Sequence, residues 1–208
     1  MADSIESDGN VNCIALFNHE EIGSVSSTGA ESSLIPTLIE RLSPNPAAYG
    51  QSVAKSFLIS SDMGHAIHPN YESKYESKHK PRMNHGIIIK TNAKQRYASD
   101  AIGSFLVKKL VESKGGKVQE FEVRNDMLAS ASPLSLGSSL TQWHRACGST
   151  VGPMLSKLGL RTVDVGNAML SMHSIRETAG SHDVQHAIDL FSAFFEGFSK
   201  LDQSLSLD

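Results

Sequence analysis

The stretch FNHEEIGS (Phe17–Ser24) decides the fold of this chain, because two adjacent carboxylates follow an apolar run that begins at Cys13. The apolar run predicts a short buried strand, which would place Glu20 and Glu21 at its C-terminal end. Ligand crevices form at that end of the strands in open α/β sheets. Neighbouring side chains point in different directions, so one carboxylate could bind a cation while the other faces its water. A solvated glutamate pair in a loop is the simpler alternative.

The composition indicates a single globular domain. The chain has 208 residues with 39% hydrophobic and 20% charged side chains, which is ordinary for a soluble protein with a real core. A net charge of -3 argues against a general binder of nucleic acid or acidic membranes. Two cysteines, Cys13 and Cys147, make no disulfide framework and favour a reducing compartment such as the cytoplasm. The sequence shows neither a secretory signal nor an apolar run near the ~18 residues of a membrane span.

Strands and helices alternate along the chain. Apolar runs predict strands, beyond the one at 13–17, at residues 55–61, 86–90, 118–123 and 161–165. Apolar residues at helical spacing predict helices over 34–42, 99–114 and 183–198. The alternation predicts an α/β protein in which helices cover both faces of a sheet.

Local signals predict where several elements begin and end. Thr28–Glu31 has the spacing of a capping box, and Pro36 predicts a kink or a late start in the helix that follows. Ser43–Pro46 predicts the end of that helix and a loop to about residue 53. Ser99 is the predicted N-cap of the next helix, and a Gly-rich turn at 147–153 predicts another helix behind it.

Candidate chemical groups stand at four strand ends. Each is weak by itself: a lone histidine is usually structural, an aspartate can cap a helix, and a lysine can end a strand in solvent. Together they offer hard oxygen ligands and imidazole, which suit zinc or a similar divalent metal. The candidates are Glu20 with Glu21, Asp62 with His65, Lys90, and His173.

Six segments, found between about residues 13 and 200, resemble the aspartyl aminopeptidase family of metallopeptidases. The resemblance implies the C-terminal portion of a catalytic domain with a zinc-peptidase-like fold, a three-layer αβα sandwich around a mixed sheet. We therefore assign residues 1–11 to a disordered leader, 12–200 to a partial catalytic domain and 201–208 to a tail. The segments are FNHEEIGS, SFLISSDMGHAIHPNY, KTNAKQRYAS, VRND, CGSTVGP and SMHSIRE.

The resemblance implies an exopeptidase that removes N-terminal Asp or Glu from peptides with two Zn²⁺ ions, for which Mn²⁺ or Co²⁺ could substitute. It also implies a homo-oligomer, and it adds a vacuolar or lysosome-like compartment as an alternative location. By position, Glu20 matches the general base, while the implied metal ligands are Glu21, Asp62 and His173. The implied substrate contacts are His65, Lys90 and Tyr97.

These roles agree with the chemistry of the side chains. Two metals lower the pKa of a shared water, and Glu20 could pass its proton to the leaving amine. A cationic Lys90 could attract an acidic side chain or a carboxylate. Tyr97 or His65 could stabilise the developing oxyanion, and the sequence does not rank the two.

The chain departs from the family at its N-terminal side. Family members are longer there and carry a further histidine ligand and a bridging aspartate. No histidine precedes Phe17 here, and Glu21, Asp62 and His173 are too few ligands for two zinc ions. We therefore expect an N-terminally truncated domain whose isolated chain has little or no activity. The alternative is a non-catalytic remnant that binds a full-length subunit.

Residues 128–145 form an atypical insertion between VRND and CGSTVGP, which we interpret as a retained intron or an error in the gene model. His19 stands where the family usually has asparagine. A serine or cysteine hydrolase using Ser149 or Cys147 with His173 is a weak rival. It lacks the G-x-S-x-G nucleophile elbow and leaves the carboxylate pair without a role.

Overall fold

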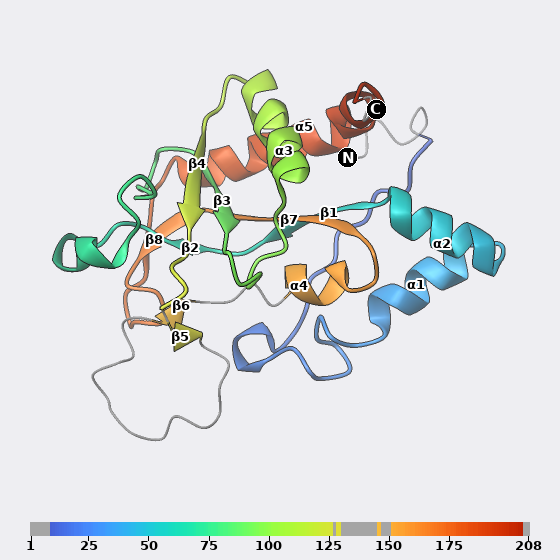
Figure 1. Cartoon of the computed structure of the whole chain (residues 1–208), viewed down its shortest axis with the longest axis horizontal. Coiled ribbons are helices and arrows are strands. Elements are labelled where there is room, and N and C mark those ends of the chain that lie inside the picture. The colour runs from blue at the N-terminus through green and yellow to red at the C-terminus, as the bar shows by residue number, and fades with distance from the viewer. Residues whose placement is uncertain (1–8, 127, 130–144, 147–150, 206–208) are drawn as a thin grey trace.

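A four-stranded mixed sheet forms the centre of the molecule (Figure 1). The structure is a computed structural model that describes residues 9–126, 128–129, 145–146 and 151–205. The strand order is β1-β7-β3-β4, with β7 parallel to β1 and antiparallel to β3, and β3 parallel to β4. The four strands confirm the four predicted beyond residue 17: β1 (Phe57–Ser61), β3 (Ile87–Thr91), β4 (Val118–Glu122) and β7 (Arg161–Gly166).

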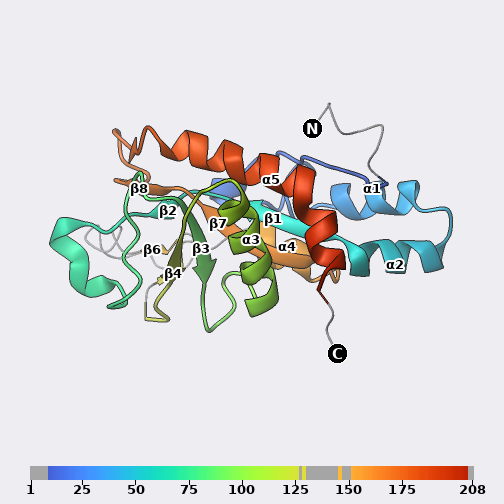
Figure 2. The ribbon, with the colours of Figure 1, turned by 90° about the horizontal axis from the view of Figure 1, so that it is seen from above.

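Helices cover both faces of this sheet, as Figures 1 and 2 show. On one face, Ile87 and Ile89 of β3 pack with Val107 and Leu190 from two long helices. On the other, Leu58 of β1 packs against a cluster built by three shorter helices. The αβα sandwich with a mixed sheet is confirmed. The helices are α3 (Ala101–Ser113) and α5 (Asp183–Gln203) on the first face, and α1 (Leu34–Leu42), α2 (Pro46–Lys55) and α4 (Val151–Ser156) on the second.

Two sequence-based predictions about the starts of α1 and α2 are wrong, and one is confirmed. α1 begins at Leu34 after Ser33, so the predicted capping box at Thr28–Glu31 is wrong. Pro36 then falls in the first turn, where its missing N–H is tolerated, and the predicted late start is confirmed. The predicted loop up to residue 53 is also wrong, because α2 occupies it. Its start is fixed by the Asn45 side chain, which accepts a hydrogen bond from Ala48 N at 2.9 Å.

The N-cap of α3 is Asp100 and not Ser99. The Asp100 carboxylate accepts a hydrogen bond from Gly103 N at 2.6 Å. Ser99 instead binds β7, since its hydroxyl accepts a hydrogen bond from Asp164 N at 2.9 Å. The one-residue error arose because both residue types are good caps and only the sheet decides which of them is free to cap.

The predicted strand at 13–17 is wrong. Residues 13–17 belong to no strand, and among the described strands none pairs with them. Leu16 is 91% exposed, whereas Phe17 packs beneath α1. An apolar run becomes a strand only when a partner supplies the hydrogen-bond ladder and a covering layer, and here the described part of the chain supplies neither.

A smaller three-stranded sheet lies beside the main one and carries two of the candidate residues. It consists of β2 (Gly64–His65), β8 (Ala168–Leu170) and β9 (Thr178–Ala179), in the order β2-β8-β9. His65 lies on β2, and His173 lies in the loop between β8 and β9. None of the described helices is long and apolar enough to cross a membrane.

The atypical segment 128–145 lies mostly outside the described residues. Its two ends are described, and they lie side by side because β5 (Leu128–Ala129) pairs in parallel with β6 (Arg145–Ala146). Cys147 and Ser149, the nucleophiles of the rival hydrolase, also lie outside the described residues. The interpretation of 128–145 as an insertion stays a prediction.

Candidate active site

The carboxylate pair lies on a tight turn. His19, with φ 61°, precedes a 3₁₀ turn at Glu20–Ile22, and Gly23, with φ 118°, ends it. His19 O accepts hydrogen bonds from Ile22 N at 3.3 Å and from Ser24 N at 2.8 Å, which closes the turn. Glu20 is half-buried and Glu21 is exposed, so the two adjacent side chains have different surroundings. The division of the pair into a base and a ligand stays a prediction.

The side chains of Glu21 and His173, which lie far apart in the sequence, are in direct contact. Glu21 Oε2 lies 2.7 Å from His173 Nε2, with side chains 67% and 49% exposed. His173 has φ 65°, in the left-handed region, within the loop that joins β8 to β9. This separation is that of a direct contact, and a carboxylate oxygen and an imidazole nitrogen are also ligand types that a zinc ion takes.

Asp62 and Lys90 form a second pair at the end of β1. Lys90 Nζ lies 3.7 Å from Asp62 Oδ2, and the lysine side chain is only 1% exposed. The ammonium donates a hydrogen bond to Met63 O at 2.9 Å and lies 5.6 Å from the centre of the Tyr97 ring. Gly166 leaves room for the lysine stem, since a Cβ there would lie 3.0 Å from Lys90 Cε. The buried ammonium is thus stabilised by a carboxylate, a carbonyl oxygen and an aromatic ring.

The structure therefore brings the candidates together in two groups, Glu21 with His173 and Asp62 with Lys90 and Tyr97. The described residues contain no group of three or more His, Cys, Asp or Glu side chains that could hold a metal ion. The Glu21–His173 pair fits zinc in the kind of its donors, whereas a catalytic zinc site needs three protein ligands. The roles of all the candidate residues, Glu20 and His65 included, stay predictions.

Tyr75 supports the strand that carries His65. Its hydroxyl donates a hydrogen bond to Ala66 O at 2.6 Å, and its ring stacks on Phe121. Burial raises the pKa of Tyr75 to about 12, so this phenol stays protonated and remains a donor at neutral pH. The position of His65 is thereby fixed from the side of the core.

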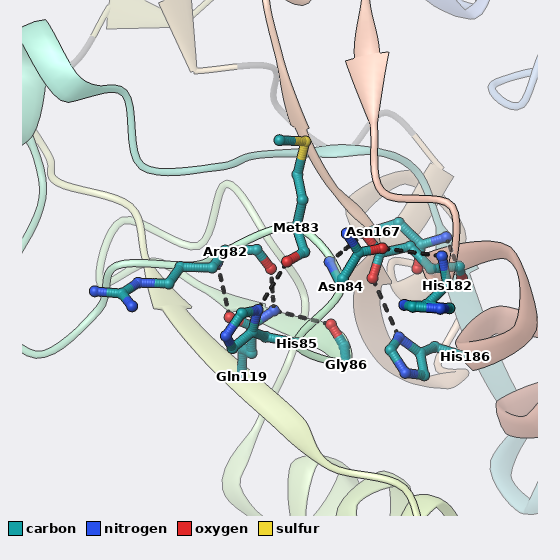
Figure 3. Close-up of polar contacts among 10 residues, drawn as sticks. Arg82, Met83, Asn84, His85, Gly86, Gln119, Asn167, His182 and His186 are labelled. Carbon is teal, nitrogen blue, oxygen red and sulfur yellow. Dashed lines mark hydrogen bonds and ion pairs between the residues drawn. The ribbon is translucent and has the colours of Figure 1, made fainter.

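A polar hub that the sequence patterns do not predict joins the start of α5 to the loop before β3 (Figure 3). The buried Asp183 carboxylate accepts a hydrogen bond from Asn84 N at 2.8 Å and contacts His186 Nδ1 at 3.1 Å. Asn84 Oδ1 accepts from His182 N at 2.9 Å, and Asn167 Nδ2 donates to Asp183 O at 2.9 Å. An acidic residue in the first turn of a helix was the only available signal, and it names no partner.

A second missed residue is Asp164, an acid in the middle of the apolar strand β7. Its carboxylate is buried and accepts a hydrogen bond from Ala98 N at 2.6 Å, next to Tyr97. A Cβ on Gly152 would collide with this carboxylate, so α4 packs directly against it. The signal was the single acidic residue within RTVDVG (Arg161–Gly166), because a charge inside a buried strand requires a partner.

Comparison with known proteins defines the class to which this fold and site belong. The profile of the family described as "Aminopeptidase I zinc metalloprotease (M18)" matches residues 1–195. The chain therefore belongs to peptidase family M18.

Two curated relatives carry the name aspartyl aminopeptidase. The chain is 43% identical over 209 residues to aspartyl aminopeptidase 1 of Schizosaccharomyces pombe. The matched region covers 99% of this chain and 40% of the relative. It is 41% identical over 224 residues to aspartyl aminopeptidase of Aspergillus oryzae. Here the matched region covers all of this chain and 41% of the relative. The chain thus spans about two fifths of the length of these relatives.

Solved structures agree with the fold. The chain in "Cryo-EM structure of the Ape4 and Nbr1 complex" matches with a TM-score of 0.78 and 44% identity, over 92% of this chain and 34% of that chain. The chain in "Structure of S. cerevesiae mApe1 dodecamer" matches with a TM-score of 0.73 and 32% identity, over 92% of this chain and 40% of that chain.

Proposed function

We propose that this chain carries part of the active site of a metalloaminopeptidase that releases N-terminal Asp or Glu from peptides. The observation that carries the proposal is the contact between Glu21 and His173 in a chain of family M18. The names of the curated relatives favour acidic residues as substrates.

In the proposed site, Glu21 and His173 would hold one zinc ion and Asp62 would bind a second. Mn²⁺ or Co²⁺ could replace zinc, because carboxylate and imidazole ligands also suit them. Zinc, when bound, would supply a Lewis acid that lowers the pKa of a water and polarises the peptide carbonyl.

The remaining steps fall to the side chains of this chain. Glu20 would take the proton of the attacking water and deliver it to the leaving amine, which requires its carboxylate to be ionised before attack. Lys90 would attract the acidic side chain or a carboxylate of the substrate once Asp62, its partner in this structure, is engaged by the second zinc ion. Tyr97 or His65 would donate a hydrogen bond to the oxyanion.

We further propose that the protein works as a homo-oligomer in the cytoplasm. The oligomer is supported by the dodecamer named for the relative mApe1. The cytoplasm is supported by Cys13, which is exposed and free, a state that a reducing compartment preserves. A vacuolar or lysosome-like compartment is the alternative.

The isolated chain is expected to show little hydrolysis, because the described residues join only two metal-ligand side chains directly. The rival proposal is a non-catalytic assembly remnant that binds a full-length subunit. It is supported by the same shortage of ligands. The two proposals differ in whether Glu20 can act once the remaining ligands are supplied.

A chimera separates these proposals. The matching residues of the Schizosaccharomyces pombe relative are replaced by this chain, and hydrolysis of Asp-, Glu- and Leu-arylamides is measured with added Zn²⁺. The peptidase proposal expects turnover of the acidic substrates that Glu20→Gln lowers by about 10²–10⁴-fold, at unchanged zinc content. A folded, oligomeric chimera that binds zinc and hydrolyses nothing would support the remnant.

A further inference from the structure

The loop that carries His173 is held in an unusual backbone conformation. Met169 pairs with Ala179 and Leu170 with Thr178, which leaves residues 171–177 as the tip of the β8–β9 hairpin. Within this tip, Ser171 has φ 59° and His173 has φ 65°. The left-handed conformation is unfavourable for a non-glycine residue, so it persists only where other contacts select it.

A backbone hydrogen bond from Ser174 N to Ser171 O, at 2.9 Å, closes the turn around His173, and one side chain makes a further contact. Glu177 Oε1 accepts a hydrogen bond from His173 N at 2.5 Å. Glu21 contacts the imidazole of the same residue at Nε2. His173 is therefore held at both of its ends, by Glu177 at the main chain and by Glu21 at the ring.

The base of the hairpin is fixed separately. Asn167, just before β8, donates to Asp183 O, and Asn84 accepts from His182 N just after β9 (Figure 3). These bonds fix where the hairpin begins and ends. They do not fix the conformation of its tip, where the contact with Glu177 lies.

We infer that Glu177 is a positioning residue that keeps His173 in the left-handed conformation from which its imidazole points at Glu21. The carboxylate acts as a hydrogen-bond acceptor for the main chain. Its charge is not what the His173 amide requires, so a neutral acceptor of the same length should replace it. The consequence for metal binding rests on the proposed function, because it takes His173 as a ligand.

Two variants of similar length isolate the acceptor. Glu177→Gln keeps an acceptor oxygen, Glu177→Met removes it, and Glu40→Met on the exposed face of α1 is the matched control. The full chain is used without metal, and hydrogen exchange of the His173 amide is followed by NMR. Unfolding in urea verifies that each variant is folded. We expect faster exchange of this amide in Glu177→Met alone.

The same proteins are then titrated with Zn²⁺ alone by calorimetry. Glu177→Met should bind about 10–100-fold more weakly than the parent chain, and Glu177→Gln should remain close to it. Unchanged amide exchange in Glu177→Met, or equal losses in the Gln and Met variants, would overturn the inference. A parent chain that binds no zinc would instead count against the proposed function, while the amide exchange still decides the role of Glu177.

Discussion

Lys90 reaches from the interior of β3 to the carboxylate of Asp62, with Nζ 3.7 Å from Oδ2. Because its other contacts are Met63 O and the ring of Tyr97, the ammonium links the end of β1 to the segment that follows β3. A buried lysine is stable only with such partners, so these contacts have consequences for stability that can be measured.

Lys90→Met should lower the free energy of unfolding by about 1–3 kcal/mol, because it leaves Met63 O without this donor and Asp62 without its cation. The apolar replacement keeps the volume of the stem, which limits the loss. Urea unfolding measures the effect, and exposed Lys94→Met is the control. Equal midpoints for the two variants would mean that the buried contacts contribute nothing net.

Asp183→Ala should destabilise the chain by about 3 kcal/mol, because it removes the charged acceptor of Asn84 N and the partner of His186. Asp189→Ala, on the same helix, should cost less than about 1 kcal/mol, since the Asp189 carboxylate accepts a solvent-exposed hydrogen bond from Gln185 within the helix. Chemical denaturation followed by circular dichroism compares the two. A larger effect at Asp189 would contradict the role assigned to the hub.

The burial of Tyr75 predicts a loss of stability at alkaline pH. Its folded-state pKa of about 12 lies above the ordinary value of 10.0, so the folded chain keeps the phenol proton where the unfolded chain releases it. The contribution is complete below pH 10 and is lost as the pH rises toward 12. Urea midpoints across this range should therefore fall less steeply in Tyr75→Phe than in the parent.

At neutral pH, Tyr75→Phe should also be less stable by about 1 kcal/mol, because the hydrogen bond to Ala66 O is lost. Tyr49→Phe, in α2, is the control for removing a phenol elsewhere. Parallel pH profiles for the parent and Tyr75→Phe would show that Tyr75 does not cause the alkaline loss.

Gly152→Ala and Gly50→Ala should change stability in opposite directions. A Cβ at Gly152 collides with the Asp164 carboxylate, so α4 must shift, at a cost of about 1–3 kcal/mol. A Cβ at Gly50 meets nothing within 4 Å in the middle of α2, so alanine should stabilise by about 0.5–1 kcal/mol. Thermal unfolding of both variants tests the packing of α4. An unchanged melting temperature in Gly152→Ala would contradict the close packing of α4 against Asp164.

Sequence alone predicted the elements whose signals are local. The main-sheet strands are short apolar runs, and α5 has a long apolar face that packs against Phe57 and the sheet. The pattern predicts a loop where α2 lies, although Asn45 and Pro46 form a strong start signal, because proline also ends helices and opens loops. The run at 13–17 failed for a different reason: strand formation depends on a partner that no local pattern reveals.

The candidate site was predictable only in part. The contact between Glu21 and His173 followed from the family resemblance, since no spacing rule joins residues so far apart in sequence. The pairing of Lys90 with Asp62 could not be predicted, because it depends on the register of β3 beside β7. Asn84, Asp164 and Asp183 were missed because their partners are mainly backbone groups, which carry no sequence signal.

The contact between Glu21 and His173 joins a turn near one end of the chain to a hairpin near the other. During synthesis on the ribosome, Glu21 leaves the exit tunnel long before its imidazole partner, because a long stretch of sequence separates Glu21 from His173. A nascent chain therefore cannot assemble this pair until His173 has left the ribosome, and any chemistry that depends on the pair begins only after that point.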